Sequence, residues 1–314
     1  MNHYRTELQV ALLAVGVCCV LVVILVGAVT TTDAPLDPYN HGEQGTSRLV
    51  EATDGAVAVS YAALDRETTP ETVIIFGGGS AVDTADVDAL QGYLDDGGTV
   101  VFLTEDEQSN RLLEALGLTS RVGAGFLRAT ATQSQSRPPA QFSVIGSETA
   151  GLKFTGVQVN VAKPLGVAAD RDDTSRTVLA QTPRAARDLN ADGRIDAAEP
   201  RGNYPVVVSE SVGAGRVILV GDASVLTNGQ WQVRQTRRLA GALTSDGALI
   251  VYPQTARFAP VSRLRLALKT PLGTVLGVPL FCAAGAIGVW LCVMLYRRAR
   301  SSQSTDQTLR ITWK

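Results

Sequence analysis

The sequence predicts an α/β fold, with a flavodoxin-like, mostly parallel sheet, a β-rich insertion and two flanking transmembrane helices. Three observations predict it. Long uncharged apolar runs lie near both ends of the 314-residue chain. Strand-like and helix-like stretches alternate from residue 56 to residue 116 and again from residue 216. Between them, from about residue 126 to 210, short β-type runs alternate with polar turns.

The first apolar run, residues 10–29, contains no charged side chain. About 20 helical residues match the roughly 30 Å hydrocarbon thickness of a bilayer, so we expect a transmembrane helix over 9–30. A cleaved signal peptide is the alternative. The apolar stretch exceeds the roughly 7 to 15 residues usual for one, and no clear small-residue cleavage site follows, which favours an uncleaved anchor.

The second apolar run, residues 270–296, ends against three arginines within 297–300. Such a cluster is typical of a stop at a lipid headgroup surface, so the run predicts a second span, with a bend at Pro279. A buried core helix is the alternative, although a domain of this size needs none of that length.

The flanking charges predict a two-pass protein of the cell membrane. Residues 1–8 and the tail 297–314 would be cytoplasmic, and residues 31–262 would form an extracytoplasmic domain. The lipid bilayer and membrane proteins would then be its partners. Three basic residues just before the second run argue against this orientation: Arg263, Arg265 and Lys269.

Charge and cysteine content exclude several function classes. Residues 31–260 hold 28 Asp and Glu against 19 Lys and Arg, a net charge of −9, so the domain should repel nucleic acid. All four cysteines lie in the apolar runs, which leaves the domain without disulfide or thiol chemistry. Scarce lysine suits a GC-rich genome or a salt-adapted organism.

The first α/β part of the domain contains one clear βαβ unit. A helix over 83–94, with Val87, Leu90 and Leu94 on one face, joins buried strands at 72–76 and 99–103. Such a unit closes right-handed with parallel strands. Around it we expect a strand at 56–61 and helices at 45–52 and 109–116.

The insertion and the second α/β part follow. Four β-type runs predict antiparallel hairpins, at 142–145, 156–161, 177–180 and 204–208, and the polar, proline-rich stretch 130–139 predicts a surface loop. The α/β pattern then returns with a strand at 216–220, a helix at 229–243 and a strand at 248–252.

Residues 188–199 (DLNADGRIDAAE) fit the 12-residue calcium loop at each defining position, with Gly193 at the sharp turn. The alternative is a solvated acidic turn. Nearby prolines exclude a helix pair, and a lone loop outside the cell binds at roughly 10⁻⁴ to 10⁻³ M, so we predict a structural calcium ion as cofactor. The expected ligands are Asp188, Asn190, Asp192, the Arg194 carbonyl, Asp196 and Glu199.

Enzymatic sites are weaker. Two histidines in the whole chain exclude a zinc cluster. Gly78 and Ser80 stand between a strand and a helix, where backbone N–H groups could meet a phosphate, but the spacing of a phosphate-binding motif is missing and a plain turn is favoured. Ser80 also lacks the second glycine of a nucleophile elbow.

Asp222 follows a buried strand, where open α/β sheets place ligand crevices, but it could equally cap the loop, and structural capping is favoured. Asn228 could cap the next helix.

Several short motifs together resemble the membrane-anchored DUF4350 family, especially its haloarchaeal members. They are Asp37-Pro38-Tyr39-Asn40 with Gly45, Gly97-Gly98 before a strand, and the run from Gly215 to Asn228. The resemblance implies a class I glutamine amidotransferase-like fold, kinship with auxiliary domains of gliding-type ABC transport systems, and genes near AAA-type ATPase and von Willebrand-like proteins. The amidotransferase nucleophile, a cysteine, and a suitably placed histidine are missing.

We therefore expect a non-enzymatic, membrane-tethered binding or scaffolding domain of an extracytoplasmic assembly or transport-related complex. Its crevice, for a partner or an unidentified small molecule, would include Asn40, Gly78, Ser80, Asp222 and Asn228. The rival hypothesis is a hydrolase that uses Ser80 or acidic residues. A third is a domain that only braces a complex.

Overall fold

The structure of the protein is a computed structural model. It describes residues 32–54, 56–64, 69–77, 82–129, 142–146, 157–169, 176–244 and 247–253, with a few isolated positions. The chain forms two units, one of residues 31–263 and the other of residues 1–30 with 264–314. All the elements below belong to the first unit.

The expected flanking transmembrane helices are not supported. Among the described residues, no helix is both long enough and apolar enough to cross a bilayer. The longest of these helices, α3 (Thr84–Asp95), has 12 residues and rises only about 18 Å, against the roughly 30 Å of a hydrocarbon core. The predicted location as a two-pass protein of the cell membrane is therefore not supported either. The runs 9–30 and 270–296 lie outside the described residues, apart from Gly16 and Met294.

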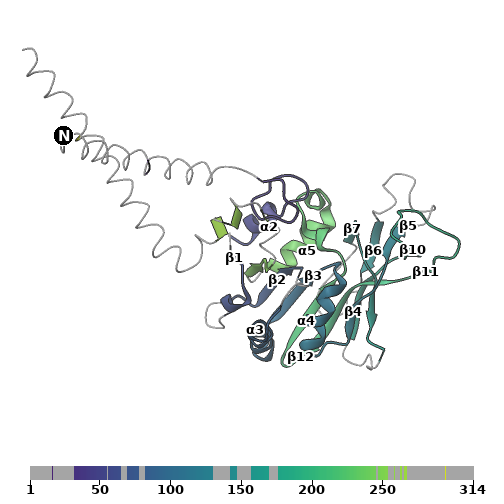
Figure 1. The fold of residues 1–314 in the computed structure, drawn as a ribbon, viewed down its shortest axis with the longest axis horizontal. Helices are drawn as coiled ribbons and strands as arrows, with labels where there is room; N and C mark the ends of the chain where they lie inside the picture. Colours follow the sequence, from purple (N-terminus) through teal and green to yellow (C-terminus); the bar gives the residue numbers. More distant parts are fainter. Residues whose placement is uncertain are drawn as a thin grey trace, which may run out of the picture. The chain divides into compact units, whose positions relative to one another are not determined.

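A nine-stranded sheet forms the centre of the domain, in the order β1-β14-β2-β3-β13-β12-β9-β6-β7 (Figure 1). Its first five strands are parallel neighbours. Runs of β-branched and other apolar residues form them because both faces of this half are largely covered. They are β1 (Val57–Ala58), β14 (Ala248–Val251), β2 (Thr72–Phe76), β3 (Thr99–Leu103) and β13 (Gly215–Val220).

The other half of the sheet is antiparallel. It contains β12 (Pro205–Val212), β9 (Arg176–Gln181), β6 (Phe142–Gly146) and β7 (Val157–Val159). Two small antiparallel sheets stand apart from it. One contains β11 (Arg201–Gly202), β10 (Ala185–Asp188) and β5 (Phe126–Ala129), and the other pairs β4 (Ser120–Val122) with β8 (Leu165–Val167).

Short helices join and cover the strands. Besides α3, the described α-helices of this unit include α2 (Ser47–Ala52), α4 (Asn110–Ala115) and α5 (Arg234–Thr244), and α2 contacts α5 (Figure 1). The 3₁₀-helices are η1 (Tyr61–Ala63), η2 (Glu107–Ser109), η4 (Ala223–Leu226) and η5 (Gln230–Gln232). Asp83 and Asp86 form a capping box that starts α3.

The βαβ unit is confirmed, but the flavodoxin-like sheet order is wrong. The predicted strands at 72–76 and 99–103 are β2 and β3, and α3 lies between them. Numbered along the chain, the parallel strands run 1-5-2-3-4, whereas a flavodoxin-like sheet runs 2-1-3-4-5. The last strand, β14, inserts between β1 and β2, so the sheet is parallel-rich and mixed.

The close packing of α3 against the sheet explains the glycine at the start of β13. Leu90 and Leu94 of α3 are fully buried in one cluster with apolar residues of β2, β3 and β13. A Cβ atom on Gly215 would lie 2.4 Å from the Gly98 carbonyl oxygen and 2.6 Å from that of Leu94. Only glycine therefore lets β13 begin this close to the end of α3.

Candidate functional site

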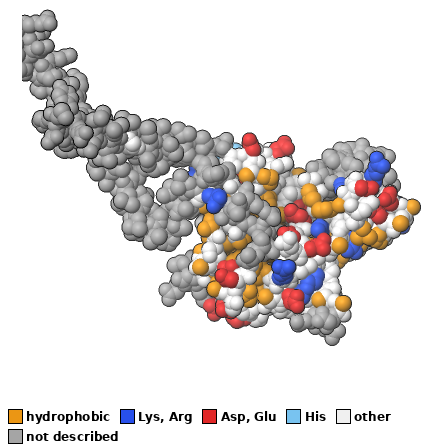
Figure 2. Space-filling view, in the orientation of Figure 1, with side chains coloured by type: hydrophobic (Ala, Val, Ile, Leu, Met, Phe, Trp, Pro, Cys, Tyr) orange, Lys and Arg blue, Asp and Glu red, His pale blue; other side chains and the backbone are white. Residues whose placement is uncertain are grey.

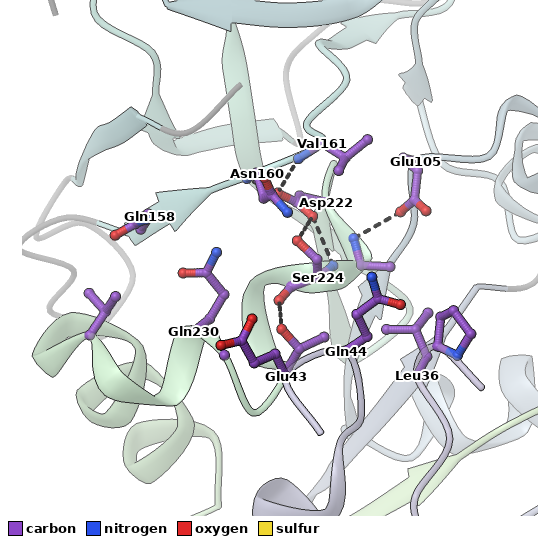
Figure 3. Close-up of a pocket in the computed structure, with 15 residues that line it drawn as sticks. Leu36, Glu43, Gln44, Glu105, Gln158, Asn160, Val161, Asp222, Ser224 and Gln230 are labelled. Carbon is purple, nitrogen blue, oxygen red and sulfur yellow. Dashed lines mark hydrogen bonds between the residues drawn. The ribbon is translucent and has the colours of Figure 1, made fainter. Parts of the chain in front are cut away.

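A cavity of about 590 Å³ lies beside the carboxyl ends of β3 and β13 (Figure 3). These strands are parallel neighbours, with Leu103 opposite Val220, so the residues after them meet at one edge of the sheet. Four segments line the cavity. They are the N-terminal loop (Pro35, Leu36, Glu43, Gln44), Glu105 after β3, the end of β7 (Gln158, Asn160, Val161) and the stretch after β13 (Asp222, Ala223, Ser224, Thr227, Gly229, Gln230, Val233).

Asp222 holds the wall of this cavity together. The side chain is fully buried, and its Oδ2 accepts hydrogen bonds from the backbone N–H groups of Asn160 (2.6 Å) and Val161 (3.1 Å). Its Oδ1 accepts from the Ser224 N–H (2.8 Å) and hydroxyl (2.7 Å). Of the two sequence hypotheses for Asp222, the structure therefore supports capping, because the carboxylate caps η4 and anchors the end of β7.

Asn228 does not line the cavity, although its chain neighbours Thr227 and Gly229 do. Its Nδ2 donates to the backbone oxygens of Asn40 and Gly42 (2.9 Å each) and to the Ser47 hydroxyl (3.1 Å). Its Oδ1 accepts from the Arg48 N–H (3.0 Å). Asn228 therefore caps the start of α2. The sequence had suggested instead that Asn228 caps the helix that follows Asn228 in the chain.

Asn40 shapes the N-terminal loop. Its Nδ2 donates to the Ala34 carbonyl (2.9 Å), and its Oδ1 accepts from the Gly42 N–H (2.7 Å). The structure thus brings Asn40 and Asn228 together in one hydrogen-bond network, whereas Asp222 lies separately in the cavity wall. Gly78 and Ser80 lie outside the described residues.

Glu105 is the cavity residue that the sequence analysis missed. It is partly buried two residues after β3, and its Oε2 accepts a hydrogen bond from the Ala223 N–H (2.9 Å). Burial raises the pKa of its carboxyl above the ordinary 4.5; the Ala223 hydrogen bond opposes this rise, and the nearby Asp222 charge adds to it. A carboxylate just after a buried parallel strand was the available signal, and it had been applied only to Asp222.

Leu36 marks the boundary with a second, smaller cavity of about 60 Å³. Both cavities are lined by Pro35, Leu36, Glu105 and Ala223, and the smaller one reaches the ends of β2 and β14 at Phe76 and Tyr252. Leu36 adopts φ 59°, a backbone conformation that is unfavourable for a residue with a side chain. Its N–H donates to the Gln44 carbonyl (2.8 Å), and its carbonyl accepts from the Thr46 hydroxyl (3.0 Å), so the loop is held in this strained shape.

The predicted calcium loop is described in full, and its first carboxylate is deeply buried. Asp188 Oδ2 accepts from the Gly193 N–H (3.0 Å) and from Arg128 Nε (3.0 Å), while its buried Oδ1 has no hydrogen-bond partner within the described part of the chain. Gly193 has φ 81°, as the sharp turn requires.

Three of the remaining predicted ligands, Asn190, Asp192 and Glu199, accept hydrogen bonds from the loop's own backbone, whereas Asp196 Oδ2 accepts from the Asn190 side-chain amide (3.5 Å). Glu199 accepts from the N–H groups of Leu189 (3.1 Å) and Asp196 (3.0 Å). Asp192 accepts from the N–H of Arg194 (2.8 Å), and Asn190 accepts from that of Asp192 (3.2 Å). Across the described ranges, no group of three or more His, Cys, Asp or Glu side chains is arranged to hold a metal ion. The loop is closed, but its oxygens are not gathered around one point.

The cavity, both asparagines and the 188–199 loop fall within one family match. A family model described as "Domain of unknown function (DUF4350)" matches residues 27–244. The chain belongs to the DUF4350 family. The match therefore confirms the family that the short motifs indicated. In this DUF4350 chain the matched region contains β2, β3 and β13 and ends at the last residue of α5.

Comparison with other proteins adds little to this. No curated protein matches the chain. Among solved structures, it is similar to "Cytoplasmic Protein STM1381" from Salmonella typhimurium LT2 (TM-score 0.40, 11% identity, 65% of this chain and 88% of that one) and to the "mmIFT52 N-terminal domain" (0.38, 16%, 56% and 77%). An exo-beta-1,4-mannosidase from Opitutaceae bacterium strain TAV5 also matches (0.29, 15%, 56%), and the chain spans a quarter of its length (25%). TM-scores this low carry no functional argument.

Proposed function

We propose that this DUF4350 domain is a non-enzymatic binding module whose ligand occupies the 590 Å³ cavity. The observation that carries the proposal is the partly buried Glu105, placed with several polar side chains around a cavity at the carboxyl edge of parallel strands. Open α/β sheets place ligand crevices at this edge, and the volume falls in the roughly 300 to 1,000 Å³ range of small-molecule sites.

The chemistry of the lining favours binding over catalysis. The described lining residues include no His, Cys or Lys that could act as a nucleophile or as the base of a nucleophilic pair. The Ser224 hydroxyl donates to Asp222, whose carboxylate is occupied by four hydrogen bonds. We also propose that the domain has an amidotransferase-like ancestry. It would lack amidotransferase activity, because no cysteine nucleophile lies between residues 31 and 260.

A scaffolding role for the same domain is compatible with this proposal, whereas nucleic-acid binding is not part of it. The net charge of −9 over residues 31–260 opposes a phosphate backbone. On the face shown in Figure 2, acidic and basic side chains are interspersed, without an extended basic patch.

The rival function, a hydrolase that uses acidic residues, is favoured by one observation. The raised pKa of Glu105 is typical of a carboxyl that acts as a general acid. Glu105→Gln separates the two functions, because it keeps the shape and the bond from Ala223 but cannot transfer a proton. We expect Glu105→Gln still to bind ligand. A hydrolytic activity of the wild type that disappears in Glu105→Gln would support the rival.

The binding test is a fragment screen by ligand-observed NMR against three proteins. Val161 lines the cavity and is 40% exposed, so Val161→Trp should obstruct the cavity without disturbing the core. Leu189→Trp is the matched control, because Leu189 is 53% exposed on the 188–199 loop. We expect fragments that bind the wild type and Leu189→Trp but not Val161→Trp. If every bound fragment tolerates Val161→Trp, the proposal is wrong.

We also propose that the 188–199 loop binds a structural calcium ion. The order of its ligand types and the buried, unpaired Asp188 Oδ1 support this, while the Arg128 guanidinium now pairs with the same carboxylate. Calcium would bind at the free Oδ1 of Asp188, beside Arg128 on Oδ2, and would draw the other loop oxygens inward. With a dissociation constant of roughly 10⁻⁴ to 10⁻³ M, about 10 mM calcium should stabilise the fold by about 1.4 to 2.7 kcal/mol.

Thermal melting in calcium, with Glu199→Gln as the comparison, checks this site. The variant should lose the calcium-dependent rise in melting temperature, because an amide cannot replace the bidentate carboxylate. If the wild type melts at the same temperature with and without calcium, the calcium proposal is wrong, and Arg128 supplies the positive charge that holds the loop.

A further inference from the structure

The charge of the cavity lining limits the ligand to certain chemical classes. Glu43, Glu105 and Asp222 contribute carboxyl groups, and the described lining residues include no Lys, Arg or His. A phosphate or carboxylate ligand would meet these groups without a compensating cation, and desolvating an unpaired anion is costly. Anionic ligands are therefore disfavoured.

The carboxyl groups are also poorly arranged for a cation. Asp222 already accepts four hydrogen bonds, and Glu105 accepts one from the Ala223 N–H. Glu43 is exposed on the rim. Among the described residues that line the cavity, no three His, Cys, Asp or Glu side chains are gathered to hold a metal ion. A cationic ligand would thus find one partly buried carboxyl and no cage.

The rest of the lining suits a neutral ligand with many hydroxyl groups. Figure 3 shows the side-chain amides of Gln44, Asn160 and Gln230 around the cavity that Glu105 also lines. An amide both donates and accepts hydrogen bonds, as a hydroxyl does, so each can serve either role of a sugar hydroxyl. Apolar C–H faces of a sugar ring would meet the apolar part of the wall, which includes Leu36 and Val161.

We propose that the cavity binds a neutral saccharide through the amides of Gln44, Asn160 and Gln230 and the carboxyl of Glu105. This rests on the proposed function and names the class of its ligand. The volume of about 590 Å³ leaves room for a short oligosaccharide. Asp222 acts at one remove, because it holds the backbone of Asn160 in the wall.

Two variants with a matched control test this assignment. Gln230 and Gln232 both lie on η5, but Gln230 lines the cavity and Gln232 is exposed outside it. Gln44 is exposed and lines the cavity from the N-terminal loop, so Gln44→Ala leaves the fold intact. Losing one net hydrogen bond should weaken sugar binding roughly three- to tenfold in Gln230→Ala and Gln44→Ala, against an unchanged affinity in Gln232→Ala.

The probes are maltose, cellobiose, lactose and N,N′-diacetylchitobiose as neutral sugars, with spermidine as a cation and inorganic phosphate as an anion, each titrated and followed by NMR. We expect saturable binding of at least one sugar that Val161→Trp abolishes. Saturable binding of spermidine or phosphate alone, or sugar binding that neither glutamine variant weakens, would overturn the saccharide assignment. Cavity-sensitive fragments with no sugar bound would also overturn it while leaving the binding module standing, whereas the absence of any cavity-sensitive fragment would remove both.

Discussion

Replacing Asn228 with alanine should destabilise the domain strongly, because this one side chain ties the N-terminal loop to the segment after β13. Asn228 makes four hydrogen bonds, all of them to residues between Asn40 and Arg48, and is 4% exposed. The two Nδ2 protons are shared among three acceptors, so the side chain makes about three full bonds. A net contribution of about 1 kcal/mol for each predicts a loss of about 3 kcal/mol in the free energy of unfolding.

Urea unfolding followed by circular dichroism measures this loss, and Asn110→Ala gives the scale. Asn110 makes two such bonds, both to the backbone of Val122 (2.9 Å and 2.8 Å), so its replacement should cost about 2 kcal/mol. Asn228→Asp should destabilise more than Asn228→Ala, because it directs a charge at the carbonyls of Asn40 and Gly42. If Asn228→Ala lowers the free energy of unfolding no more than Asn110→Ala does, the proposed role of Asn228 in this hydrogen-bond network is wrong.

Four further variants test other parts of the structure. Glu105→Gln should raise the free energy of unfolding near neutral pH. The pKa of Glu105 is higher in the folded state than in the unfolded state, so the wild type loses stability as the pH rises above about 4.5, whereas glutamine does not titrate. In melts across this pH range, the difference between the variant and the wild type should vanish at low pH. Asp222→Ala should lower the melting temperature and speed hydrogen exchange at Asn160 and Val161, which lose their acceptor; unchanged exchange there would contradict the capping role. Gly241→Ala, in open space on α5, should stabilise by up to about 1 kcal/mol, whereas Gly215→Ala should destabilise; equal effects in chemical denaturation would exclude the close approach at Gly215.

Local patterns in the sequence predicted the elements that bury both faces. The runs at 72–76 and 99–103 are unbroken β-branched and apolar residues, and both became strands over those ranges. The helix between them has its own capping aspartates, so its start was also legible. The predicted helix at 229–243 instead divides into η5 and α5, because Val233 between them has extended φ and ψ angles.

Long-range pairings could not be predicted in the same way. The place of β14 between β1 and β2 depends on contacts across about two hundred positions of sequence, which no local period records. Asn228 satisfied the rule for a helix cap, but its acceptor serves Arg48, 180 residues away. Glu105 became a candidate only once the structure placed Ala223 against it.

Strand β12 has a consequence for how the domain can be divided. It pairs with β13 on one edge and with β9 on the other, so the parallel and antiparallel halves share one continuous backbone ladder. A fragment that lacked residues 126–212 would leave β13 as an edge strand with unpaired N–H and C=O groups. Such an edge pairs readily with a strand of another molecule. Because β12, β9, β6 and β7 are themselves strands of the nine-stranded sheet, neither part should stay monodisperse when expressed without the other.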